Sequence, residues 1–320
     1  MVRIKKKGIM AMFAGIALAG AAFLTPGVSS AAGSEHYTFA LITHAQPGDT
    51  FWDVVRKGAE AAAKKDNVKL IYLSSPTASS QAQLVQNVTQ QHVDGIAVTL
   101  AFPDAMAPAV KQAEQAGIPV VGLNSGINAW QKLGLLMYVG QDEMVAGEGV
   151  GERLNSLGAK SVLCLDQQQG AVQLLARCNG IAKTFKGKTQ ILYTPGADMA
   201  AAQSRMVAKL QQDPSIDYII TLGAPFAPTA LNAIRMAGSN AKVGTFDMSP
   251  QAVNMIRQGT LQFAVDQQPY VQGYEAIDLM WLYKHNDDVV GGGHAILTGP
   301  AFVTKANVEQ VAAFAKRGTR

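Results

Sequence analysis

Two aromatic side chains stand beside polar ones in residues 44–52, which read HAQPGDTFW. Phe51 and Trp52 follow a β-rich run and open a helical one, a position that a bound small molecule can reach. An aromatic ring stacks on the apolar C–H face of a pyranose or furanose, and neighbouring polar groups then bind its hydroxyls. Packing in a protein core uses the same rings, so the sequence leaves that alternative open.

Motifs for other chemistries are incomplete. Residues 147–151 (GEGVG) lack the third glycine of a dinucleotide loop, and residues 187–189 (GKT) lack the opening glycine of a phosphate loop. The five histidines show no metal-ligand spacing, and no Gly-x-Ser-x-Gly motif occurs. We therefore predict no metal, no cofactor and no enzymatic activity. The alternative is an exported carbohydrate-acting enzyme with Asp49 and Asp247 as acid and base.

The amino terminus has the three parts of a cleaved secretory signal. Lys5–Lys7 are followed by an apolar run from Ile9 to Leu24 and by the small residues at 29–33. We predict a signal peptide over 1–32, cut after Ala32, and hence a periplasmic protein. A membrane anchor is the alternative, but the run is interrupted by glycines and is short against the ~20 residues needed to span a bilayer.

Loss of this segment changes the charge of the chain. The sequence has 27 Lys and Arg and 23 Asp and Glu, and four of the basic residues but none of the acidic ones precede residue 33. The remainder is therefore neutral, which argues against nucleic acid or an anionic lipid surface as a partner.

Cys164 and Cys178 are the two cysteines of the chain. Export places them where disulfides persist, and a bridge closing so short a loop stabilises a fold by roughly 3 kcal/mol. We predict a disulfide between them, with two buried thiols as the alternative.

The rest of the chain alternates β-rich runs with stretches long enough for one helix each. This pattern is typical of βαβ units and parallel sheets. The runs are 37–43, 68–73, 95–100 and 118–123, and then 161–165, 190–193, 218–222, 243–246 and 261–265. The repetition predicts an α/β protein made of two doubly wound parallel-sheet lobes.

No Pro/Gly/Ser-rich linker separates the halves, so the lobes must be joined by short structured crossings. We place these at 138–142 and 266–269 and expect them to act as a hinge. The predicted first lobe is 33–141 plus 269–297, and the second is 142–268 plus 298–320. In such sheets a ligand binds at the carboxyl ends of the strands.

An ordered set of segments resembles the periplasmic sugar-binding proteins of the ribose-binding type, which are type I periplasmic binding proteins. The segments are 44–52, 94–96 (DGI), 117–121 (GIPVV), 245–247 (TFD) and 266–273 (DQQPYVQG). The resemblance implies a protein that captures a monosaccharide or sugar polyol and delivers it to the inner-membrane permease of an ABC importer. We predict a monomer, because a capture protein gains nothing from a symmetric interface. A sensory adaptor that presents the same ligand to a chemoreceptor or sensor kinase is the alternative.

The resemblance also implies a ligand-binding set. Its members are Asp49, Phe51, Trp52, Asn124, Arg177, Asp247 and Gln267, with His44, Gln141 and Asp142 as further candidates. Structural roles are open for several of them: a turn for Asn124, a solvated helix charge for Arg177, and a hinge tie for Gln267. Asp142 and Asp247 are also suited to capping the helices that follow them.

One segment departs from the family pattern. Residues 223–226 (GAPF) stand where many members have an Asn-Asp pair, so this chain lacks two polar side chains of the usual set. Phe226 would add an apolar wall there, and His44 or Gln46 would supply polar groups from the other lobe.

Overall fold

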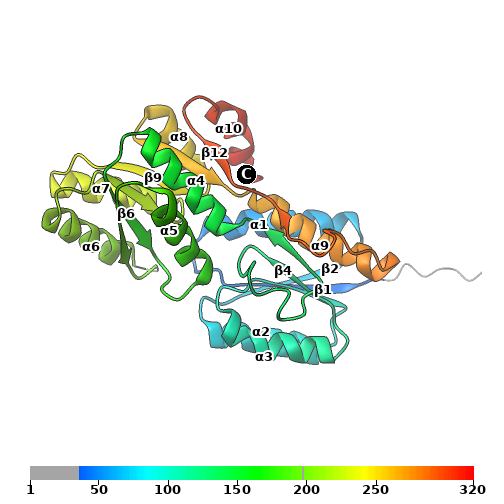
Figure 1. Cartoon of the computed structure of the whole chain (residues 1–320). Helices are drawn as coiled ribbons and strands as arrows, with labels where there is room; N and C mark the ends of the chain where they lie inside the picture. Colours follow the sequence, from blue (N-terminus) through cyan, green and yellow to red (C-terminus); the bar gives the residue numbers. More distant parts are fainter. Residues whose placement is uncertain (1–35, 197) are drawn as a thin grey trace, which may run out of the picture. The chain divides into compact units, whose positions relative to one another are not determined.

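The computed structural model describes residues 36–196 and 198–320, and the predicted signal segment 1–32 lies outside the described residues. The described chain forms two six-stranded sheets, each with helices on both faces (Figure 1). The predicted α/β class with two parallel-sheet lobes is confirmed.

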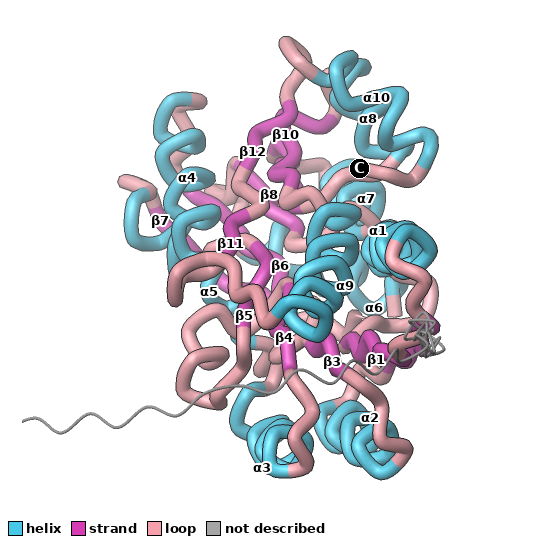
Figure 2. Tube along the Cα trace, turned by 90° about the vertical axis from the view of Figure 1, so that its right-hand side faces the viewer, coloured by secondary structure: helices cyan, strands magenta, loops and turns pink. Residues whose placement is uncertain are grey.

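The first lobe contains a sheet with the order β11-β5-β4-β3-β1-β2, in which every neighbouring pair is parallel. The strands are β1 (Thr38–Thr43), β2 (Lys69–Ser74), β3 (Gly95–Val98), β4 (Val120–Leu123), β5 (Met137–Gly140) and β11 (Ile296–Leu297). The helices are α1 (Thr50–Lys65), α2 (Ala78–Gln90), α3 (Pro103–Gln115) and α9 (Pro269–Asn286). Helices α1 and α9 lie side by side on one face, and α2 and α3 cover the other (Figure 2).

The second lobe repeats this plan with the order β12-β10-β9-β8-β6-β7. The strands are β6 (Ser161–Asp166), β7 (Lys188–Tyr193), β8 (Tyr218–Thr221), β9 (Lys242–Phe246), β10 (Leu261–Asp266) and β12 (Ala301–Val303). The helices are α4 (Glu143–Ser156), α5 (Val172–Thr184), α6 (Met199–Gln212), α7 (Phe226–Ala237), α8 (Pro250–Gln258) and α10 (Val308–Arg317). Helices α4 and α5 cover one face, and α6, α7, α8 and α10 pack on the other. Only β12 runs antiparallel to its neighbour within this described sheet.

Glycines allow the closest helix pair of the first lobe to form. A Cβ on Gly58 of α1 would lie 2.0 Å from the carbonyl oxygen of Tyr270, and one on Gly273 of α9 would lie 1.9 Å from that of Val55. Any larger residue at either position would push the helices apart, because backbone atoms cannot yield as a flexible side chain can. The α1–α9 contact holds the amino end of α1 in place above the sheet.

The chain passes between the lobes three times, each time within a few residues. The crossings lie between β5 and α4, between β10 and α9, and between β11 and β12. Several short parallel connections of this kind permit rotation of one lobe against the other while both keep their cores.

The nine β-rich runs predicted from the sequence all contain strands. Three strands were not predicted. Strand β5 overlaps the segment 138–142, which the sequence suggested only as a crossing, and β11 and β12 are too short to produce an alternating pattern.

The predicted disulfide is present. Cys164 on β6 and Cys178 on α5 are joined, with Cα atoms 5.9 Å apart, and both are fully buried. The bridge ties α5 to its sheet. Among the described helices, none combines the length and apolar composition required to span a bilayer.

Candidate functional site

A cavity of about 210 Å³ lies between the lobes. Its walls are formed largely by residues that follow strands, namely β1 and β4 in the first lobe and β6, β8, β9 and β10 in the second. This is the edge at which parallel α/β sheets bind ligands. The predicted residues that line it are His44, Asp49, Phe51, Trp52, Asn124, Arg177, Asp247 and Gln267.

The aromatic pair forms the apolar part of the wall. Phe51 and Trp52 lie in the first turn of α1, with their rings 5.1 Å apart and nearly perpendicular. Each is about nine-tenths buried, with 7% and 6% of its surface exposed. Both also contact the core of the first lobe, so packing and cavity lining coexist in the same rings.

Asp49 positions this pair. Its side chain caps α1 by accepting a hydrogen bond from the backbone N–H of Phe51, at 3.1 Å. Burial is the largest effect on this carboxyl group and raises its pKa to about 6. One group therefore begins the helix and adds an acceptor to the cavity.

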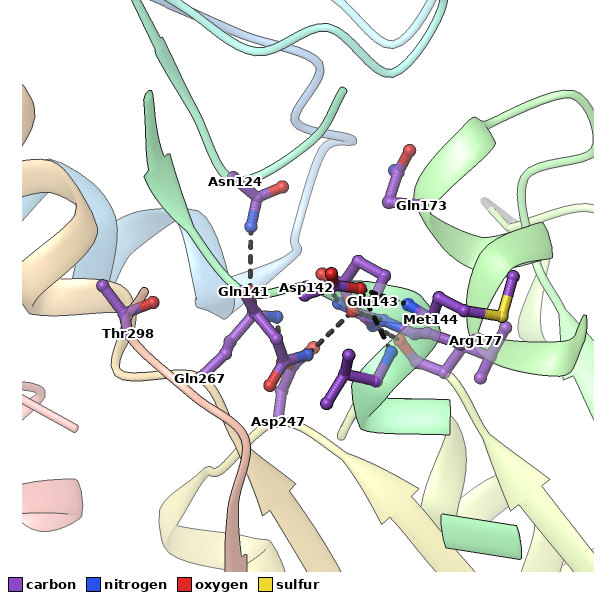
Figure 3. Close-up of polar contacts among 12 residues, drawn as sticks. Asn124, Gln141, Asp142, Glu143, Met144, Gln173, Arg177, Asp247, Gln267 and Thr298 are labelled. Atoms are coloured by element: carbon purple, nitrogen blue, oxygen red, sulfur yellow. Dashed lines mark hydrogen bonds and ion pairs between the residues drawn. The ribbon is translucent and has the colours of Figure 1, made fainter. Parts of the chain in front are cut away.

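A chain of side-chain hydrogen bonds crosses the base of the cavity (Figure 3). Asn124 Nδ2 donates to Gln267 Oε1 at 3.2 Å and to Gln272 Oε1 at 3.1 Å, and Gln267 Nε2 donates to Asp247 Oδ1 at 2.6 Å. Because the Asn124 amide hydrogens face glutamine oxygens, its carbonyl oxygen is the atom it offers to a ligand. Through these side-chain bonds Gln267 connects the crossing to both lobes, whereas the hinge alternative had supposed backbone hydrogen bonds, and it also lines the cavity.

Asp247 has a backbone conformation that aims it into the cavity. It follows β9 with φ of 68°, in the left-handed region that Asn and Asp tolerate better than most residues. It does not cap α8, because Ser249 occupies that position and accepts from the backbone of Ala252. Burial raises the pKa of Asp247 to about 7, and the nearby Arg177 guanidinium opposes this rise.

Arg177 is a buried group and not the solvated helix charge that the sequence left open. Only 3% of it is exposed. It forms a two-point ion pair with Glu143, in which Nε lies 2.6 Å from Oε2 and Nη2 lies 2.9 Å from Oε1. Nη1 also donates to the carbonyl oxygen of Leu222, and the guanidinium stacks over Phe246.

His44 bridges the lobes. Its Nδ1 lies 2.8 Å from Thr99 Oγ1, and its Nε2 lies 3.0 Å from the side-chain amide nitrogen of Gln173 on α5. Burial, followed by the charge of Arg177, lowers the pKa of His44 to about 3, so the imidazole is neutral. Its ring also meets Trp52 edge to face at 4.8 Å.

Further hydrogen bonds join the lobes beside the cavity. The backbone N–H of Val172 donates to the carbonyl oxygen of Ala101 at 3.0 Å, and Gln168 Nε2 donates to that of Pro76 at 3.2 Å. With the imidazole contact described above, they define a closed arrangement in which first-lobe groups bind second-lobe groups directly.

Two predicted residues do not line this cavity. The Asp142 side chain caps α4 by accepting from the backbone N–H groups of Met144 and Val145, which leaves it outside the cavity. Gln141 is fully buried at the crossing and donates to Glu143 Oε2 at 2.7 Å. Asp142 is thus a helix cap, as the alternative supposed. The Gln141 side chain binds Glu143 and does not reach the cavity.

The structure adds residues that the sequence argument missed. Gln167 and Gln168 line the cavity directly after β6, so the rule that ligand groups follow strands applied to them as well. Gln173 and Glu143 lie on helices and do not directly follow a strand. The sequence does not indicate which residues of another helix or lobe they will contact. Phe226 and Gln46, in contrast, were expected from the sequence as replacements for the family's Asn-Asp pair, and both line the cavity together with Gly223.

No cluster of three or more His, Cys, Asp or Glu side chains suited to a metal ion occurs within 36–196 and 198–320. The cavity offers hydrogen-bond acceptors, one paired guanidinium and aromatic surface, which is a set for a neutral hydroxylated molecule.

Comparison with known proteins places this geometry in a family. The profile of the periplasmic binding protein domain matches residues 39–287. A carbohydrate transporter protein from Acidothermus cellulolyticus, solved in complex with myo-inositol, is 57% identical, with a TM-score of 0.88 and coverage of 89% of this chain and 100% of that one.

Curated relatives are more distant. The ribose import binding protein of Bacillus subtilis is 28% identical over 249 residues, which are 76% of this chain and 78% of that protein. The xylose/arabinose-binding protein of Sulfolobus acidocaldarius is 27% identical over 237 residues, 68% of this chain, and the match spans 58% of its own length. The extent of the domain match and the two-lobed cleft together show that this chain belongs to the periplasmic binding protein domain family.

Proposed function

We propose that this protein is the substrate-binding component of an ABC importer and that its ligand is myo-inositol or a closely similar cyclic polyol. The observation that carries the proposal is the cavity between the lobes, whose walls combine an aromatic pair with carboxylate, amide and guanidinium groups. The 57% identity to a protein solved with myo-inositol supports the choice of ligand within this class.

The proposed contacts follow from the chemistry of each side chain. The apolar face of the ring lies against Trp52, with Phe51 beside it. Ring hydroxyls donate to the carboxylates of Asp49 and Asp247 and to the carbonyl oxygen of Asn124, and they accept from the guanidinium of Arg177. Each hydroxyl both donates and accepts, so a cavity with both kinds of partner suits a fully hydroxylated ring.

Capture proceeds by closure of the lobes over the ligand. Groups from both lobes complete the binding set only in the closed form, so the ligand favours that form over the open one. The inner-membrane permease then recognises the closed pair of lobes. We propose that the segment 1–32 directs export to the periplasm, that the mature protein is a monomer, and that it releases its ligand chemically unchanged.

The test is calorimetric titration of the protein comprising residues 33–320 with myo-inositol. We expect one site per chain, a dissociation constant in the micromolar range or below (about −8 kcal/mol or stronger), and recovery of unaltered ligand. Ribose, xylose and arabinose serve as matched controls and should bind at least tenfold more weakly. Preferred binding of a pentose would replace the proposed ligand, and conversion of the ligand would contradict a transport role.

A further inference from the structure

Glu143 is the first residue of α4, and its carboxylate pairs with the guanidinium of Arg177 (Figure 3). It is only 2% exposed, and both of its carboxylate oxygens bind the Nε and Nη2 side of Arg177. Glu143 does not line the cavity that holds the proposed ligand. Its position therefore suits a residue that acts on the ligand through Arg177.

The donors of Arg177 can be counted. A guanidinium has five N–H groups, of which two donate to Glu143 and one to the carbonyl oxygen of Leu222. One hydrogen on each Nη remains for the cavity. Glu143 thus fixes the plane of the guanidinium and decides which two donors a ligand meets.

Helix packing holds the two partners in register. A Cβ on Gly147 of α4 would lie 2.2 Å from the carbonyl oxygen of Arg177 itself, and one on Gly180 of α5 would lie 2.3 Å from that of Met144. Within the glycine-rich residues 147–151, Gly147 and Gly151 therefore serve the close approach of α4 to α5, while Gly149 faces Phe302. This contact brings the first residue of α4 alongside the middle of α5.

The pair also connects with the first crossing between the lobes. Gln141, which follows β5, donates to Glu143 Oε2 at 2.7 Å. Asp142 then caps α4 from the same short segment. The orientation of Glu143 is fixed from both sides, by the crossing and by α5.

The charge of the site follows from this arrangement. Arg177 is the one cationic side chain of the described cavity wall, and it is paired with Glu143, which does not line the cavity, while Asp49 and Asp247 contribute negative charge. Resting on the proposed function, we infer that Glu143 is a positioning residue that makes the site select neutral polyols against sugar acids. A sugar carboxylate would meet two carboxylates and a guanidinium whose charge is already balanced.

The test compares wild type with Glu143→Gln, which keeps the shape of the side chain and removes its charge. Dissociation constants are measured for myo-inositol and for D-glucuronate as the anionic probe. We expect myo-inositol affinity to fall about tenfold or more, because the guanidinium loses its anchor, and the preference for myo-inositol over D-glucuronate to fall at least about tenfold. Glu148→Gln, on the same helix but paired with Lys183 at the surface, is the matched control and should change neither value.

A double-mutant cycle separates positioning from general packing. In the Arg177→Gln background, adding Glu143→Gln should leave the preference unchanged, because the group through which it acts is gone. A preference that shifts equally in both backgrounds, or not at all in either, would overturn the inference.

Should Glu143→Gln fail to fold, Gln141→Leu gives a milder test, since it frees Glu143 Oε2 without leaving a buried charge unpaired. It should weaken myo-inositol binding several-fold, and unchanged affinity would count against the inference. If wild type itself does not bind myo-inositol, the proposed function fails first. If wild type binds and the variants behave as wild type, only the inference fails.

Discussion

Asn124 and Asp247 occupy equivalent positions in the two lobes. Each directly follows the fourth strand of its lobe, each has a left-handed backbone with φ of 65° and 68°, and each donates its N–H to the next strand, to Val139 and Val265 respectively. Gln267 joins them through one amide. The repeated fold therefore places one polar group from each lobe at the same site.

The first prediction concerns the aromatic wall. Trp52→Ala should weaken myo-inositol binding about tenfold or more, because it removes the stacking surface and part of the buried apolar area. Trp52 fluorescence should also change on ligand addition in the wild type. Trp281, which stacks on His285 away from the cavity, provides the control: Trp281→Phe should retain both the affinity and the signal. Unaltered affinity in Trp52→Ala would show that the ring only packs the core.

The second prediction concerns pH. Burial raises the pKa of Asp247 from 3.8 to about 7, and ligand hydroxyls that donate to the carboxylate favour its charged form. Binding should then release a proton, so affinity should rise with pH by up to about tenfold per unit below pH 7. Asp247→Asn should bind more weakly and lose this dependence near pH 7, while a shallower step near the Asp49 pKa of about 6 remains.

The raised pKa of Asp247 also determines how the stability of the ligand-free protein changes with pH. Because the folded pKa of Asp247 is raised, the ligand-free fold binds a proton more readily than the unfolded chain between about pH 4 and 7. Its contribution to stability is present below this window and is lost as pH rises through it. His44, whose pKa is about 3 in the folded protein against 6.5 in the unfolded chain, affects stability with the opposite sign. The effect of Asp247 alone is therefore measured as the melting temperature of the wild type minus that of Asp247→Asn at each pH. A difference in melting temperature that does not change with pH would contradict this assignment.

The third prediction concerns the disulfide. Cys164 and Cys178 are separated by 14 residues, and replacing both by Ala should lower the free energy of unfolding by about 3 kcal/mol. Because α5 carries both Cys178 and Arg177, myo-inositol affinity should also fall. Denaturant unfolding with and without reductant measures the first effect, and the double variant should show no further response to reductant. Equal stability of the wild type in both conditions would contradict the prediction.

The fourth prediction uses two glycines of one helix. Gly147→Ala should destabilise the protein and weaken binding, because its Cβ would collide with backbone 2.2 Å away. Gly149→Ala meets only the ring of Phe302, at 3.2 Å, and should be neutral or stabilising by up to about 1 kcal/mol through helix propensity. Similar behaviour of the two variants in thermal unfolding would show that the α4–α5 approach is not tight.

Local sequence patterns were sufficient to predict much of the fold, and the family resemblance supplied much of the site. Strands such as β1 and β6 are six-residue runs rich in apolar residues. Asn124 and Asp247 were named through the family resemblance, and both follow strands, where ligand groups are expected. Strand β11 has only two residues and depends on pairing with β5, so tertiary contact creates it. Glu143 was missed for a related reason: its significance lies in facing Arg177 across a glycine contact, which no local pattern records.

The most direct test of the central claim is the crystal structure of the protein grown with saturating myo-inositol. We expect one cyclitol in the cavity between the lobes, with its ring on Trp52, hydroxyls on Asp247 and Asn124, and Arg177 still paired with Glu143. An empty cavity under these conditions, or a cyclitol bound only outside it, would contradict the proposed function.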